Sequence, residues 1–165
     1  MAKVIAVCTS EAKGTRKTCR PQIRLLRDWG VSGDAHAGHW HRQVSLLSYE
    51  QIEALRSHGA DVDCGAFGEN ITLSGSDLKL LPVGTRILIG DCVLEVSQIG
   101  KKCHDRCEIS RKLGTCIMPR EGIFAVVVRG GIIMPGDEAR VEAAPPDEAV
   151  LKYLEGKDEK RVFAF

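Results

Sequence analysis

Two cysteines lie in a basic segment, at a spacing that suits thiolate chemistry. Residues 100–107 read GKKCHDRC. If the chain is helical from Cys103 onward, Cys103 and Cys107 share one face, with Cys103 near the helix N-terminus. The helix dipole, Lys101 and His104 then all favour ionisation of Cys103. Because a thiolate attacks sulfur and ligates soft metals, Cys103 is predicted to be the reactive residue, and Cys107 to resolve it by disulfide exchange.

The same segment has two other interpretations. Thiolates and imidazole are zinc ligands, and four such residues occur here: Cys103, His104, Cys107 and Cys116. The adjacent positions of the first two fit a tetrahedral zinc site poorly. In the third interpretation these cysteines are small core residues. That is what we expect of three other cysteines, which lie in or beside apolar runs: Cys8, Cys64 and Cys92.

Residues 33–41, GDAHAGHWH, hold three histidines in a glycine-rich stretch without periodicity, which indicates a loop. Histidine-rich tracts bind metals, but this one lacks the glutamate of a zinc-protease motif, so hydrolytic zinc is not predicted. Asp34 is expected to orient His36 and fix its tautomer at the site. The alternative is that Asp34 caps a turn and His36 lies on the surface.

An anionic ligand would need a local basic cluster, since the net charge of the chain is only +1. Arg42 directly precedes an apolar strand, so its guanidinium is predicted to be fixed at the rim of a site, where it can hold an oxyanion with two hydrogen bonds. Lys101 is a second candidate. Three basic residues of an early loop are expected to be solvated instead: Lys13, Arg16 and Lys17.

Glu69 and Asn70 enter an apolar strand and must find partners if they are buried. Either they line a ligand cleft or they lock the fold. We expect a structural lock at Glu69 and a cleft role at Asn70.

Composition narrows the functional classes. At 165 residues the chain has the length of one domain, predicted to span residues 1–165 with its core at about 4–143 and a closing helix and tail at 144–165. No apolar run reaches the length of a membrane span, no secretory signal is recognised, and the near-neutral charge disfavours nucleic acid. Seven cysteines, an odd number, suit free thiols in the cytoplasm.

The elements that must position these residues are mostly short strands. Apolar runs at 4–8, 23–29, 44–47 and 123–128 predict strands, and residues 87–96 predict a hairpin around Gly90-Asp91. Ser48 with Gln51 predicts a capping box that opens a helix, and residues 149–154 predict a short helix. Many short strands with two or three helices favour a mainly β (α+β) fold built on a closed or nearly closed β-barrel.

Several strings occur in a characteristic order: GDAHAG at 33–38, RQVSL at 42–46, FGENIT at 67–72, Gly84 and Gly90, Cys103, and PGD at 135–137. Together, over residues 4–141, they resemble the MOSC domain family, named for the C-terminal part of molybdenum-cofactor sulfurases. The chain departs from the family where Lys102 replaces a proline before the key cysteine. It also lacks the aminotransferase-like module that generates persulfide.

The resemblance implies a MOSC-type β-barrel, a Cys103 that carries sulfur or meets molybdenum, and a role in molybdopterin metabolism. The molybdenum cofactor would be held by Arg42, Asn70, Lys101 and His104, with pyridoxal phosphate not expected in this domain alone. The expected partner is a cysteine desulfurase-like sulfur donor or a cofactor-biosynthesis enzyme. Two alternatives stay open: a non-enzymatic, zinc-stabilised module that docks onto such an enzyme, and a reductase accessory for N-hydroxylated compounds.

Overall fold

The computed structural model describes residues 1–102, 111, 114 and 116–154. Its main feature is a closed barrel in the order β11-β7-β8-β9-β5-β6-β1, which closes where β11 pairs with β1. The barrel strands are β1 (Ala2–Thr9), β5 (Val44–Ser48), β6 (Ile71–Ser74), β7 (Arg86–Ile89), β8 (Cys92–Ile99), β9 (Ile123–Arg129) and β11 (Glu138–Glu142). The predicted mainly β barrel is confirmed.

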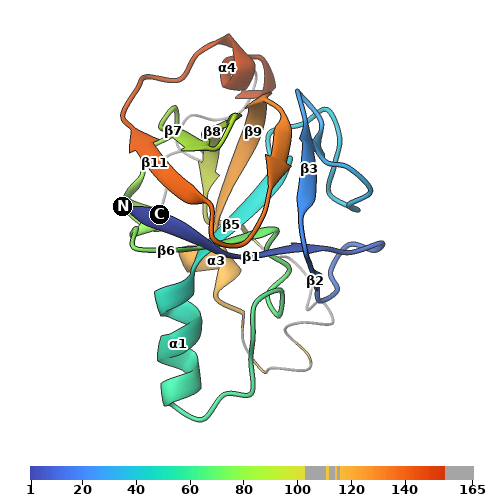
Figure 1. The fold of residues 1–165 in the computed structure, drawn as a ribbon, viewed down its shortest axis with the longest axis vertical. Coiled ribbons are helices and arrows are strands. Elements are labelled where there is room, and N and C mark those ends of the chain that lie inside the picture. The colour runs from blue at the N-terminus through green and yellow to red at the C-terminus, as the bar shows by residue number, and fades with distance from the viewer. Residues whose placement is uncertain (103–110, 112–113, 115, 155–165) are drawn as a thin grey trace.

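Smaller elements surround this barrel. β2 (Thr18–Arg20) pairs with the end of β1, and a separate sheet joins β10 (Gly131–Ile133), β3 (Ile23–Leu26) and β4 (Gly30–Val31). The helices are α1 (Tyr49–Ser57), α3 (Met118–Glu121), α4 (Glu148–Leu154) and the 3-10 turn η1 (Leu78–Leu80). Figure 1 shows α1 and α4 at opposite ends of the molecule. None of the helices in the described part of the chain is long and apolar enough to cross a membrane.

Local sequence accounts for most barrel strands. The β-branched run in β9 is almost wholly buried, as its place between β5 and β8 requires. Gly90 adopts a positive φ of 57° in the tight turn between β7 and β8, which pair antiparallel as predicted. β5 and β6 pair in parallel, so a crossover connection is needed, and α1 lies within it.

The predicted capping box at the start of α1 is wrong. Ser48 is the N-cap residue, but its side chain makes no capping hydrogen bond. Instead, the Ser48 hydroxyl donates to the carbonyl of Ser76 at 2.8 Å. Ser48 is also the last residue of the buried strand β5. Its bond to Ser76 therefore connects the segment before η1 to the barrel.

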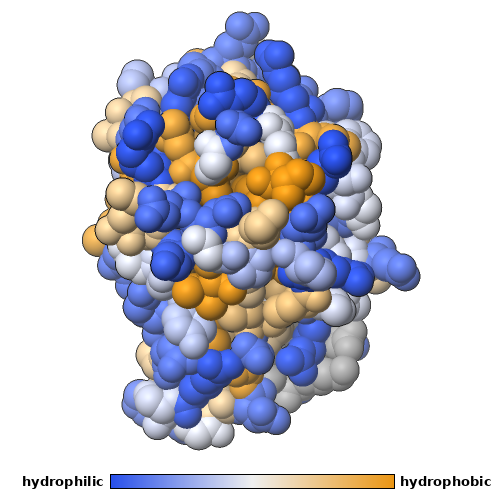
Figure 2. Space-filling model, viewed as in Figure 1, coloured by the Kyte–Doolittle hydropathy of each residue, from blue (hydrophilic) through white to orange (hydrophobic). Residues whose placement is uncertain are grey.

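Apolar side chains fill the barrel and the space beside it. The interior cluster takes residues from each barrel strand, for example Val4, Leu46 and Leu94, and a second cluster packs α1 and α3 against the barrel wall through Ile52 and Met118. Figure 2 shows that hydrophobic residues on the viewed face are interrupted by hydrophilic ones. The barrel wall is therefore a packed support on which the surrounding loops are held.

Candidate functional site

Three segments meet beside the end of β1: the β1–β2 loop, which holds both Ser10 and Lys17, the loop after β4, and the segment at Gly65. Ser10 directly follows β1, Lys17 directly precedes β2, and Asp34 follows β4. Main-chain hydrogen bonds fix the loops: Ala35 N–H donates to the Ser10 carbonyl at 2.9 Å, and Lys17 N–H donates to the Gly65 carbonyl at 2.8 Å. The barrel edge thus brings together side chains that are far apart in the sequence.

A buried ion pair forms the centre of this meeting point. Lys17 Nζ donates to Asp34 Oδ1 at 2.7 Å, to Ser10 Oγ at 3.0 Å and to His36 Nδ1 at 2.9 Å. Asp34 also accepts the main-chain N–H groups of Ser10 and His36, both at 3.0 Å. The Lys17 and Asp34 side chains are 0% exposed. All three ammonium protons are therefore used, as burial of a lysine requires.

Burial disfavours the charged forms of both Lys17 and Asp34, and the contact between the two charges favours them. The hydrogen bond and charge of Lys17 hold the pKa of Asp34 below its ordinary value despite burial, so Asp34 is a carboxylate. Burial lowers the pKa of Lys17, and the Asp34 carboxylate offsets part of that effect. The prediction that Lys17 is a solvated surface residue is wrong, because its ammonium is an internal part of the site.

His36 is neutral at physiological pH. Burial lowers its pKa to about 4, and the positive charges of Lys17, Lys101 and Lys13 act in the same direction. Because the Lys17 ammonium donates to Nδ1, the neutral ring carries its proton on Nε2. Asp34 holds the main chain of His36, while its Oδ2 lies 3.8 Å from Nδ1. The tautomer is therefore fixed by Lys17, and not by Asp34 as the sequence suggested.

This depressed pKa predicts a pH-dependent contribution of His36 to stability. The unfolded imidazole takes up a proton as the pH falls below about 6.5, whereas the folded one does so only near pH 4. The contribution is thus complete above pH 6.5 and is lost as the pH falls toward 4. We expect the unfolding free energy of the wild type, relative to His36→Gln, to fall by about 2–3 kcal/mol across this window.

Urea denaturation at pH 7, 6, 5 and 4 measures the difference. His58→Gln is the matched control, because it alters an exposed histidine after α1 and leaves His36 in place. The control should keep the wild-type pH profile. Parallel profiles for wild type and His36→Gln would contradict the assignment of a neutral, buried His36.

Cations and an aromatic ring lie next to His36. Trp40 Nε1 donates to the His36 carbonyl at 2.8 Å, which fixes the indole. The Arg42 guanidinium lies 4.6 Å from the centroid of the Trp40 ring and 5.6 Å from that of Phe124, while Lys13 Nζ lies 5.0 Å from the Trp40 centroid. These cation–π contacts hold positive charge beside a flat apolar surface. The structure therefore places Arg42 against two aromatic rings, and its predicted role in holding an oxyanion stays a prediction.

The end of β8 brings Lys101 to the same region. His41 Nε2 is 2.7 Å from Gln98 Oε1, and Gln98 Nε2 donates to the Gly100 carbonyl at 2.8 Å. Lys101 N–H then donates to the Pro119 carbonyl at 3.2 Å. The histidine loop and the chain leading to Lys101 are therefore joined, which agrees with the influence of the Lys101 charge on His36.

Asn70 does not occupy the cleft position predicted for it. Its side chain is fully buried, where Nδ2 donates to the Cys8 carbonyl at 3.1 Å and Oδ1 accepts the Ser45 N–H at 3.1 Å. These bonds tie β1 to β5. Glu69 accepts the N–H groups of Gly65 and Phe67, and burial raises its pKa to about 7. Both side chains therefore stabilise the fold, a role that was expected for Glu69 but not for Asn70.

Three predicted site residues, Cys103, His104 and Cys107, lie outside the described residues. The fourth residue of the proposed zinc set, Cys116, is half-buried and packs against the cluster beside the barrel. Among the residues that the structure describes, no group of three or more histidine, cysteine, aspartate or glutamate side chains is placed to hold a metal ion. The zinc hypothesis thus stays a prediction.

The comparisons with known proteins agree with this architecture. A sequence model described as the MOSC domain matches residues 33–140. The YuaD protein of Bacillus subtilis is similar in structure, with a TM-score of 0.73 at 21% identity over 88% of this chain and 98% of YuaD. YiiM of Geobacillus stearothermophilus has a TM-score of 0.67 at 18% identity, covering 93% of this chain and 82% of YiiM. No curated protein sequence matches the chain significantly.

Proposed function

Because the chain belongs to the MOSC domain family, we propose that it binds the molybdenum cofactor and carries sulfur for it through Cys103. The observation that supports this most is the cationic rim formed by Lys13, Arg42 and Lys101 around the neutral His36. Cys103 follows Lys101 by two residues in the sequence. A nearby positive charge favours a thiolate.

The residues present fit an anionic pterin. Arg42 offers a forked donor for a phosphate oxygen, and the Trp40 indole beside it offers an apolar face for a flat ring. His36 would donate its Nε2 proton to an acceptor on the ligand, since Lys17 holds Nδ1. When bound, the cofactor would supply a molybdenum centre that accepts sulfur. The chain itself would hold the phosphate, orient the ring and present the thiolate.

The sulfur step requires a donor. The Cys103 thiolate attacks the outer sulfur of a donor persulfide, which forms the Cys103 persulfide and releases the donor as a thiol. A cysteine desulfurase-like protein in the cytoplasm is the partner we propose, because such a protein supplies sulfur as a persulfide.

The test loads the reduced protein with polysulfide and measures intact mass. The wild type should gain about 32 Da per persulfide, located at Cys103 by peptide mass. Cys103→Ser should lose the gain on this peptide, while Cys92→Ala, which changes a thiol buried in β8, should keep it. Equal loading of Cys103→Ser and wild type would overturn the assignment. One firmly bound zinc per chain, found by metal analysis, would favour the interaction module instead.

A further inference from the structure

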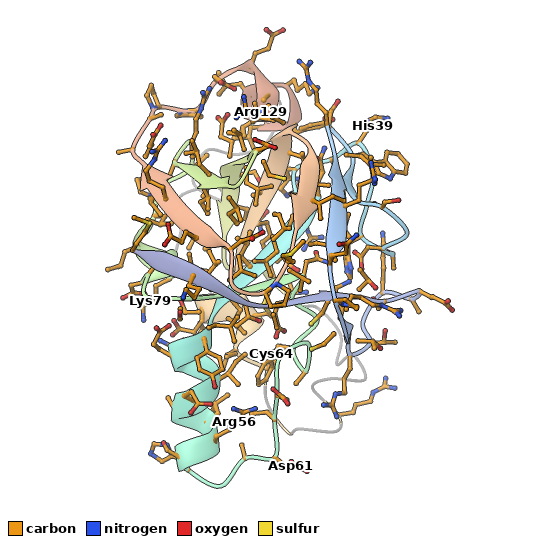
Figure 3. All side chains as sticks on the ribbon, in the orientation of Figure 1. His39, Arg56, Asp61, Cys64, Lys79 and Arg129 are labelled. Carbon is orange, nitrogen blue, oxygen red and sulfur yellow. The ribbon has the colours of Figure 1, made fainter. Side chains whose placement is uncertain are left out.

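Three cysteines that the proposed sulfur transfer does not use lie together on the barrel wall at the β1–β2 pair. Cys8 lies in β1 and Cys19 in β2, directly opposite one another in the antiparallel register. The Cys8 thiol donates to Cys19 Sγ across 3.1 Å, and Cys19 Sγ is 3.6 Å from the carbonyl oxygen of Cys64. Figure 3 shows Cys64 just below β1. Cys8 is a buried core residue, as its apolar run predicted, and it also contacts a second thiol.

The backbone already has the geometry of a disulfide. Directly opposed residues of an antiparallel pair have Cα atoms about 4.5–5.5 Å apart, inside the range of about 4.4–6.8 Å that disulfides span. The two sulfurs would have to approach by only about 1 Å to reach bonding distance. Rotation of the exposed Cys19 side chain can supply this movement while both strands stay in place.

The two thiols differ in access. Cys19 is exposed, whereas Cys8 is fully buried. Burial, together with the contact to Cys19, raises the pKa of the Cys8 thiol. A reagent in solution therefore meets Cys19 first, and Cys8 is placed to react only with Cys19 Sγ.

We propose that Cys8 and Cys19 form a reversible dithiol–disulfide site that exchanges with low-molecular-weight disulfides of the glutathione type. The Cys19 thiolate attacks one sulfur of the disulfide, giving a mixed disulfide and one released thiolate. Cys8 then gives up its proton to the released thiolate, and its sulfur attacks Cys19 Sγ, which breaks the mixed disulfide and expels a second thiolate that takes up the proton Cys19 had lost. In total, two protein thiols are oxidised to one disulfide, and one small disulfide is reduced to two thiols.

This bond would close the hairpin that carries the buried ion pair. Ser10 lies two residues after Cys8, and Lys17 lies two residues before Cys19. Lys17 belongs to the Lys17–Asp34–His36 network, and Ser10 contacts it through its main-chain N–H and its hydroxyl. A covalent link between the strands would therefore fix the loop from which Lys17 reaches His36.

The test incubates the folded, full-length protein with oxidised glutathione and then alkylates the remaining thiols in denaturant. Trypsin should release residues 4–13 joined to residues 18–24, because Arg20 precedes a proline and is not cleaved. The mass should be about 2 Da below that of the two reduced peptides, and dithiothreitol should separate them. Cys8 and Cys19 should both escape alkylation.

Variants separate this pairing from others. Cys19→Ser should block the reaction, and Cys8→Ala should stop it at one glutathione on Cys19. Cys64→Ala and Cys92→Ala should form the link as the wild type does. The proposal is overturned if the wild type keeps glutathione on Cys19, if Cys19 joins Cys64, or if no link between peptides 4–13 and 18–24 forms. None of these results depends on whether Cys103 carries sulfur.

Discussion

Replacing Lys17 with methionine should lower the free energy of unfolding by about 3–5 kcal/mol, the range for breaking a buried ion pair by removing one partner. Methionine keeps the unbranched shape of the side chain but removes the charge and three donors. Asp34, which is 0% exposed, would then be an uncompensated buried carboxylate, and Ser10 Oγ and His36 Nδ1 would each lose a donor. Urea denaturation at pH 7 measures the change.

Arg16→Met is the matched control for this variant. It also removes one cationic side chain from the same loop, but Arg16 is exposed. The control should stay within about 0.5 kcal/mol of the wild type. If Lys17→Met were as stable as the control, the buried ion pair would not exist as described. Because Lys17 also fixes the His36 tautomer, Lys17→Met should raise the pKa of the imidazole, which NMR titration detects.

Gly65→Ala should destabilise the protein by about 3–5 kcal/mol, the combined cost of a left-handed backbone at a non-glycine residue and of overpacking. Gly65 has a φ of +86°, and an added Cβ would lie 2.2 Å from the Lys17 carbonyl oxygen and 3.3 Å from Cys8 Sγ. Gly65 also accepts the Lys17 N–H. The segment carrying Lys17 would therefore have to move away.

Gly59→Ala separates the two causes. Gly59 has a similar φ of +89°, yet nothing lies within 4 Å of its added Cβ. This variant should cost only about 1 kcal/mol, the backbone term alone. Thermal or urea unfolding of both variants gives the comparison. Equal losses would mean that the close approach of Lys17 to Gly65 contributes nothing.

The strands were predictable because their signals are local. The β-branched run that became β9 and the Gly90-Asp91 turn between β7 and β8 depend on neighbouring residues only. Barrel closure was inferred from the number of short strands, and the pairing of β1 with β11 supplies it. The capping box failed because Ser48 found a partner distant in the sequence, at Ser76, which no local pattern reveals.

Only those parts of the site whose residues are close in the sequence could be predicted. Asp34 and His36 are neighbours in one loop, so their association could be read from the sequence. Lys17 could not be identified, because its burial depends on loops that meet only in the folded barrel. Asn70 was misplaced because a buried polar residue can satisfy its hydrogen bonds either with a ligand or with main chain, and composition does not distinguish the two.

The pairing of β1 with β11 also constrains how the chain folds during translation. Ala2 lies opposite Ala139, and Val4 N–H donates to the Asp137 carbonyl at 2.8 Å. β1 is synthesised well before β11, so the edge of β1 that pairs with β11 stays unpaired until β11 has been made. Contacts so distant in the sequence form slowly, and an unpaired strand edge is prone to aggregation until its partner covers it.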